Sequence, residues 1–149
     1  MVLYHGSNVE VRDPRLLKTQ RDLDFGKGFY TTSDLEQAEK WARRTAARLE
    51  QQQSFVSVYK VDEEKLFSLR ILRFVVANRK GITSADQWDM ICGPVANDQT
   101  MPVIDLFLDG MYDEDETIKR LLPQKLKDQY TFKTLEAIRL LQCREVIRL

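Results

Sequence analysis

Histidine and cysteine are scarce in this chain: its 149 residues include one histidine and two cysteines, Cys92 and Cys143. With a single histidine and no Cys-x-x-Cys pair, no zinc-type ligand set can be assembled, and we expect no metal. Each cysteine stands in an apolar stretch. This predicts two reduced thiols in the core, as in proteins of a reducing compartment.

Long apolar runs and an excess of either charge are also missing. No apolar stretch approaches the roughly 20 residues of a membrane-spanning helix, and residues 1–8 (MVLYHGSN) lack the pattern of a secretory signal peptide. We therefore expect a cytoplasmic protein without membrane contact. Basic and acidic residues both number 23, which argues against a polycation that coats nucleic acid or anionic membranes.

Length and composition are those of one globular domain. Hydrophobic residues make up 43% and charged residues 31% of the chain, which is ordinary for a soluble protein. No repeat, low-complexity tract or linker divides the sequence, so we expect a single domain over residues 1–149. β-branched, aromatic and alternating apolar patterns predict strands at 2–5, 28–32, 54–61, 88–95, 129–133 and 143–148.

The strongest helical pattern follows Ser33, an N-cap residue that forms a capping box with Glu36. Its expected apolar face consists of Leu35, Ala38, Trp41, Ala42, Thr45 and Leu49. Further helices are expected at 98–109, 114–122 and, capped by Thr134, 134–141, with one turn at 14–18 and a strand followed by a helix within 66–78. This mixture lacks strict strand–helix alternation and favours the α+β class.

Three short segments carry residue types suited to ligand chemistry. YHGS at 4–7 places the only histidine at the end of an apolar strand, before a glycine that lets backbone approach a ligand closely. DFGKGFY at 24–30 joins a glycine-rich loop to an aromatic strand. In DQYTF at 128–132, Gln129 and Thr131 share one strand face. Taken singly, each segment has an ordinary structural explanation, namely a satisfied histidine, a loop-to-strand turn and an amide that faces water.

Together and in this order, the three segments resemble the poly(ADP-ribose) polymerase-type ADP-ribosyltransferase superfamily. In that superfamily a first strand ends in His-Gly, a second runs from Phe-Gly-Lys-Gly into a tyrosine, and a late strand carries a glutamate. The segments DFGKGFY, FVVANR (74–79), CGPVAND (92–98) and LKDQYTF (126–132) are also similar to a family of small bacterial proteins of unassigned function grouped with these enzymes. The resemblance implies an ADP-ribosyltransferase-like α+β fold, a split antiparallel β-sheet sandwich with flanking helices around an NAD cleft.

The resemblance also implies a role for each matching residue. His5 would hydrogen-bond a ribose hydroxyl of NAD+, the Gly6 backbone would pair with the nicotinamide amide, and Ser7 would assist. Tyr30 would stack on the nicotinamide ring. Trp41 would cover the other side of the ring, unless it only anchors the helix in the core. The loop over the ADP half would contribute Arg21, Gly26, Lys27 and Gly28.

Gln129 stands where active transferases carry the glutamate that stabilises the oxocarbenium-like transition state. An amide keeps a hydrogen bond but loses the charge, and removing a well-aimed group costs about 3–4 kcal/mol, or roughly 10²–10³ in rate. Three interpretations stay open. The chain is a mono-ADP-ribosyltransferase whose acceptor supplies the missing base, an enzyme that uses Asp128 or Asp98 instead, or an inactive module that binds NAD+ or ADP-ribose. Polymer elongation is disfavoured in all three.

The predicted function is a mono-ADP-ribosyltransferase with His5, Tyr30 and Gln129 as catalytic residues. It would cleave NAD+ at the nicotinamide–ribose bond and transfer ADP-ribose to a protein, nucleic-acid or small-molecule acceptor, as a bacterial toxin or regulatory modifier. By analogy with short transferase toxins, a small neutralising protein is an expected partner. A purely structural domain is the third alternative, and the long polar loop at 18–28 argues against it.

Seven basic residues could form a rim near the cleft: Arg12, Arg15, Lys18, Arg21, Arg43, Arg44 and Arg48. Such a rim would favour a nucleic-acid acceptor. Nearby acidic residues make a solvated surface the simpler interpretation.

Overall fold

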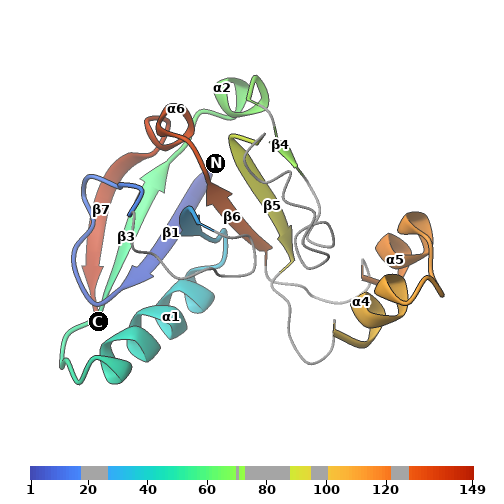
Figure 1. The fold of residues 1–149 in the computed structure, drawn as a ribbon. Helices are drawn as coiled ribbons and strands as arrows, with labels where there is room; N and C mark the ends of the chain where they lie inside the picture. Colours follow the sequence, from blue (N-terminus) through green and yellow to red (C-terminus); the bar gives the residue numbers. More distant parts are fainter. Residues whose placement is uncertain (18–26, 70, 73–87, 95–100, 122–127) are drawn as a thin grey trace.

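The computed structural model describes residues 1–17, 27–69, 71–72, 88–94, 101–121 and 128–149. Within these ranges the strands form two separate sheets (Figure 1). The first has the order β1-β3-β7 and is antiparallel throughout, with β1 at Val2–Ser7, β3 at Phe55–Lys60 and β7 at Gln142–Arg148. The second has the order β2-β6-β5-β4, in which only β4 and β5 run parallel, with β2 at Phe29–Thr31, β6 at Asp128–Phe132, β5 at Met90–Pro94 and β4 at Ile71–Leu72.

Five helices accompany the sheets in the described ranges. They are α1 (Leu35–Arg48), α2 (Glu63–Phe67), α4 (Met101–Leu108), α5 (Glu114–Leu121) and α6 (Leu135–Ile138). Figure 1 shows α1 beneath the first sheet, and α4 beside α5 at some distance from both sheets. The chain is therefore a mixed α/β protein with two small sheets, as the predicted α+β class requires. No helix in these ranges combines the length and apolar character needed to cross a membrane.

The main core lies between the two sheets. Leu3 and Tyr59 from the first sheet pack with Phe29, Met90 and Phe132 from the second, and all five are less than a tenth exposed. Because side chains alternate along a strand, the residues next to Leu3 in β1 point to the opposite face. The two faces of β1 therefore serve different purposes: one builds the core and the other receives α1.

Helix α1 packs closely on the outer face of the first sheet. Ala38 and Ala42 are fully buried there against Val56. A Cβ atom added to Gly6 would lie 1.9 Å from the backbone oxygen of Ala38 and 2.8 Å from the backbone nitrogen of Ala42. Gly6 is thus needed for helix packing, a reason that the sequence did not reveal.

The start of α1 differs from the sequence prediction by one residue. Asp34, not Ser33, is the N-cap, and its carboxylate accepts a hydrogen bond from the Gln37 backbone N–H at 2.9 Å. The predicted apolar face is confirmed at Ala38 and Ala42 but not at its two leucines, since Leu35 and Leu49 are exposed at 36% and 49%. The buried residues of the helix are Gln37, Ala38, Ala42 and Ala46.

The short elements account for the other differences. Helix α2 was not predicted, although Asp62 at its N-cap and the acidic first turn are ordinary start signals. Helix α6 has the predicted cap, since Thr134 Oγ1 accepts from the Ala137 N–H at 3.2 Å, but it ends at Ile138. The turn of helix expected at 14–18 does not form over 14–17, and the helix expected after β4 lies outside the described residues.

Neither cysteine forms a disulfide, as predicted, but neither is fully buried. Cys92 and Cys143 are partly exposed and pack against the margin of the main core rather than inside it.

Candidate functional site

The pairing of β1 with β2 stops after one residue pair, and His5 lies at this break. Tyr4 and Thr32 exchange both backbone hydrogen bonds, at 2.8 and 2.9 Å, as an isolated bridge. In a continuing antiparallel ladder, Gly6 and Tyr30 would form the next such pair. Instead the imidazole Nδ1 of His5 lies 2.7 Å from the Tyr30 carbonyl oxygen. A side chain therefore takes the carbonyl that the ladder would have used.

The break leaves the backbone of Gly6 directed toward Tyr30. Hydrogen-bonding groups alternate between the two edges of a strand. Since both backbone groups of Tyr4 point to β2, those of Gly6 lie on the same edge of β1. A neighbouring N–H and C=O on one edge form a donor and acceptor pair that suits a primary amide. The role that the resemblance implies for Gly6 stays a prediction.

The contact with Tyr30 fixes the tautomer of His5. A carbonyl oxygen can only accept, so Nδ1 carries the hydrogen and Nε2 is the acceptor of the neutral ring. Burial lowers the pKa of His5 below its ordinary value of 6.5, although the hydrogen bond to the Tyr30 backbone acts in the opposite direction. The ring also stacks on Phe29, with centroids 4.4 Å apart and planes inclined by 28°. His5 thus presents an oriented acceptor that suits a hydroxyl donor.

Tyr30 and Gln129 share one face of the second sheet. Tyr30 pairs with Thr131, and directly opposed residues of an antiparallel pair point to the same side. Gln129 precedes Thr131 by two positions and therefore joins the same face. Tyr30 is 6% and Gln129 4% exposed. The fold thus places Tyr30 and Gln129 on one sheet face, whereas the His5 ring contacts the Tyr30 backbone and stacks on Phe29, whose side chain points to the other face.

Several buried polar atoms in this region have no hydrogen-bond partner within the part of the chain that the structure describes. They include Nε2 of Gln129, Oγ1 of Thr131 and Oε1 of Gln37. Leaving a buried polar group unpaired costs about 1–3 kcal/mol, so such groups call for a ligand, an ordered water or another specific reason. All three side chains are neutral, and they suit an uncharged ligand that both donates and accepts.

Gln37 is the residue of this region that the sequence analysis missed. It lies in the first turn of α1, is 4% exposed, and donates from Nε2 to the backbone oxygen of Asp128 at 3.4 Å. The one available signal was a long amide beside the helix start on a face otherwise made of alanines.

Asp128 does not join Gln129, because consecutive strand residues point to opposite faces. Its carboxylate accepts from the Ser33 hydroxyl at 2.5 Å, the Ser33 N–H at 3.3 Å and the Tyr130 hydroxyl at 3.0 Å. Burial and this carboxylate raise the pKa of Tyr130 above its ordinary value. Asp128 thus ties β6 to the start of α1, while Asp98, the other carboxylate considered, lies outside the described residues.

The other predicted binding residues are distributed as follows. A Cβ added to Gly28 would lie 2.4 Å from Thr131 Cγ2, so Gly28 packs directly over the Gln129 face. Ser7 Oγ makes only long contacts of 3.4 Å to its neighbours Asn8 and Val9. Trp41 is partly exposed on α1 and Lys27 is exposed, whereas Arg21 and Gly26 lie outside the described residues.

The expected basic rim is partly neutralised by ion pairs. Arg12 pairs with Glu10 at 3.3 Å, and Arg15 pairs with Asp13 at 2.8 Å. Arg43 lies 3.6 Å from Glu39 on α1. Acidic neighbours thus offset the charge of these three arginines, and the nature of the acceptor stays a prediction.

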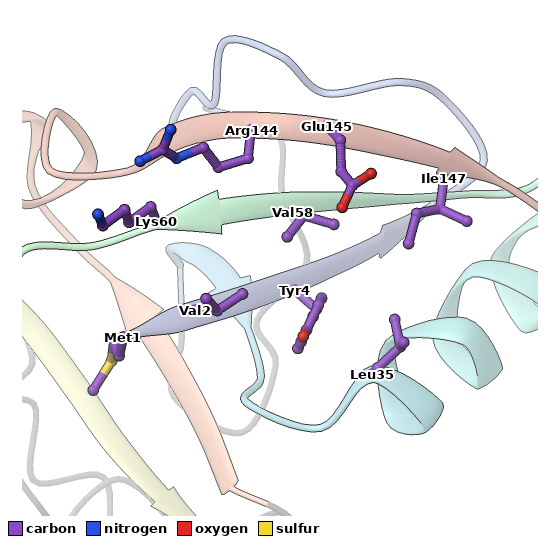
Figure 2. A pocket seen from close by; sticks show the side chains of 9 residues that line it. All are labelled: Met1, Val2, Tyr4, Leu35, Val58, Lys60, Arg144, Glu145 and Ile147. Atoms are coloured by element: carbon purple, nitrogen blue, oxygen red, sulfur yellow. The ribbon is translucent and has the colours of Figure 1, made fainter.

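A groove of about 480 Å³ lies elsewhere, on the outer face of the first sheet (Figure 2). Tyr4, Val58 and Ile147 line it, and Figure 2 shows Lys60 and Arg144 at one end. It contains none of the predicted site residues, because His5 and Tyr4 point to opposite sides of β1. The groove is therefore separate from the candidate site.

A family model described as "Protein of unknown function (DUF3990)" matches residues 1–143. The chain therefore belongs to the DUF3990 family. No curated protein and no solved structure matches it.

Proposed function

We propose that this member of the DUF3990 family is a mono-ADP-ribosyltransferase with NAD+ as its co-substrate, and that its two sheets form an ADP-ribosyltransferase-type fold. One observation carries the proposal: His5 holds the Tyr30 carbonyl at 2.7 Å where β1 and β2 separate, and Gln129 lies on the Tyr30 face. The support is thus one contact of His5 with the Tyr30 backbone and one sheet face shared by Tyr30 and Gln129.

Each group has a role in binding NAD+. His5 Nε2 accepts a hydrogen bond from a ribose hydroxyl, because Nδ1 is already engaged. The Gly6 N–H and C=O pair with the carboxamide of nicotinamide. The Tyr30 ring stacks on the nicotinamide ring, with Trp41 as its second aromatic partner. Ser7 and the loop residues Arg21, Gly26, Lys27 and Gly28 hold the rest of the dinucleotide.

The reaction begins with cleavage of the bond between ribose C1′ and the nicotinamide nitrogen. The bonding electron pair stays with that nitrogen, so nicotinamide leaves as a neutral molecule and C1′ becomes an oxocarbenium centre. A nucleophile of the acceptor then forms a bond to C1′, and its proton passes to a base of the acceptor or to water. Gln129 orients the ribose by a hydrogen bond but supplies no negative charge, so we expect slow turnover.

The neutral site favours transfer of a single ADP-ribose unit. Elongation needs a base for the incoming ribose hydroxyl, and the described face of β6 carries Gln129 and Thr131 in place of a carboxylate. A non-catalytic module that binds NAD+ or ADP-ribose is the second candidate function. Gln129 favours this candidate too, because its amide can bind a ribose hydroxyl but lacks the negative charge of a catalytic glutamate.

The cellular setting follows from the same resemblance and remains part of the proposal. We propose a cytoplasmic toxin or regulatory modifier that works without metal or membrane. Its acceptor is a protein, a nucleic acid or a small molecule, and its partner is a small neutralising protein.

The test is nicotinamide release from NAD+ by the purified chain, beside His5→Ala and Gln129→Glu. We expect measurable release, its loss in His5→Ala, and a gain of roughly 10-fold or more in Gln129→Glu because the charge is restored. Gln142→Glu, an exposed glutamine on β7, is the matched control and should change nothing.

Binding of NAD+ measured by calorimetry separates the two candidates. Binding without release, even with cell lysate as the source of acceptor, would leave the non-catalytic module. Absence of binding would contradict both candidates.

A further inference from the structure

The side chain of Gln37 is held in one orientation and leaves one atom unused. Its Nε2 donates to the Asp128 backbone oxygen at 3.4 Å. Because that oxygen can only accept, a flipped amide would place two acceptors face to face, so the orientation is fixed. Oε1 consequently points elsewhere, and within the described part of the chain it has no partner although the residue is only 4% exposed.

The unused acceptor belongs to a side chain that is bound to the residue before Gln129, and the Gln129 amide has an unused donor. Asp128 precedes Gln129 on β6, so the hydrogen bond to Asp128 holds the Gln37 amide one residue away from Gln129 along the strand. Gln129 Nε2 is equally buried and also lacks a partner among the described residues. One acceptor and one donor, both uncharged, are what two adjacent sugar hydroxyls need, since each hydroxyl can donate and accept.

We propose that Gln37 is a second ribose-binding amide of the NAD+ site: its Oε1 accepts a hydrogen bond from a hydroxyl of the nicotinamide ribose whose other hydroxyl is held by Gln129. This inference rests on the proposed function. It implies that the ribose is recognised without any charged side chain from β6 or the first turn of α1. A site built in this way discriminates strongly against a missing hydroxyl, because its buried polar groups are then left unpaired.

The experiment measures binding of NAD+ and of two analogues that lack the 2′- or the 3′-hydroxyl of the nicotinamide ribose. Gln37→Met removes the amide and nearly preserves its size. We expect Gln37→Met to weaken NAD+ binding by about 3- to 10-fold, the value of one hydrogen bond. The same substitution should have little effect on one of the two analogues, because the lost hydroxyl was the partner of Gln37. An equal penalty for all three ligands, or no penalty with NAD+, would overturn the inference.

A second variant separates ligand binding from the support that Gln37 gives to β6. Gln37→Glu keeps an acceptor oxygen but loses the donor to Asp128, so it should retain the preference for NAD+ over the responsive analogue. If both variants lose affinity equally for every ligand, the contact with Asp128 is the cause and the inference fails. Gln53→Leu, an exposed glutamine beyond α1, is the control.

Binding of NAD+ by the wild-type protein distinguishes a failure of the proposed function from a failure of the role of Gln37. If it does not bind NAD+, the proposed function fails and this inference fails with it. If it binds NAD+ and the Gln37 variants bind equally well, only the role of Gln37 is wrong.

Discussion

The imidazole Nδ1 of His5 lies 2.7 Å from the carbonyl oxygen of Tyr30, at the point where β1 and β2 stop pairing. The contact therefore links the division of the protein into two sheets with the candidate site. It satisfies a carbonyl that the interrupted ladder leaves without its next partner, and it fixes which nitrogen of the ring can accept. A residue that would be catalytic by resemblance is thus also a junction of the fold.

This double role predicts a dependence of stability on pH. Burial holds the pKa of folded His5 below the unfolded value of 6.5. Its neutral form therefore contributes fully above pH 6.5, and the contribution is lost as the pH falls through the folded pKa. His5→Asn keeps an N–H that can donate to Tyr30 but does not titrate. Urea denaturation at several pH values should show a loss on the acid side of pH 6.5 in the wild type and a smaller loss in His5→Asn. Parallel curves would contradict the prediction.

The closeness of β1 and α1 predicts that Gly6→Ala destabilises the protein. The new Cβ would meet backbone atoms of Ala38 and Ala42, which cannot move without shifting the helix. Overpacking of this kind costs about 1–3 kcal/mol and occasionally more. Gly110→Ala is the matched control: it has open space around it and a φ of +78°, so only backbone strain applies, at about 1–2 kcal/mol. An unchanged free energy of unfolding in Gly6→Ala, measured by chemical denaturation, would contradict the packing argument.

The long, strongly patterned elements could be predicted from the sequence, and the short ones could not. Alternation of apolar residues identified β3, and helical spacing identified α1, because each pattern repeats several times. Helix α2 spans only Glu63–Phe67, and β4 only Ile71–Leu72. Elements of this size depend on tertiary contacts, such as the burial of Leu66 in the main core, more than on local preference.

The candidate site was predictable only as far as its residues form continuous motifs. His5 lies in the segment YHGS and Tyr30 in the segment DFGKGFY. Gln129 could be predicted because it lies at the start of an aromatic strand, where the transferases carry a glutamate. Gln37 has no such segment, since its partner is a backbone carbonyl of β6 that only the fold brings to α1. For the same reason Ser33 was predicted to cap a helix, although in the structure it binds Asp128.

The assignment of Asp34, rather than Ser33, as the N-cap of α1 gives a further prediction. Asp34→Ala removes the acceptor of the Gln37 backbone N–H and should destabilise the protein by about 1 kcal/mol. Asp34→Ser restores a capping oxygen and should recover most of this loss. Thermal unfolding of the three proteins tests this, and an Asp34→Ala variant as stable as the wild type would contradict the assigned cap.

Asp128 provides the sharpest distinction between a structural and a catalytic carboxylate. Its side chain is bound by Ser33 and Tyr130 on the face opposite to Gln129. Asp128→Ala should therefore lower the free energy of unfolding by about 1.5–3 kcal/mol, the range for hydrogen bonds to a charged group. Below the unfolding temperature, its release of nicotinamide from NAD+ should stay close to that of the wild type, because the charge does not face the ribose. Gln129→Leu should do the opposite, with weakened release and a smaller loss of stability than Asp128→Ala, since Nε2 of the amide has no partner to lose within the described residues. If Asp128→Ala remains folded and releases no nicotinamide, Asp128 is the carboxylate that the reaction uses, and Gln129 is not the catalytic position.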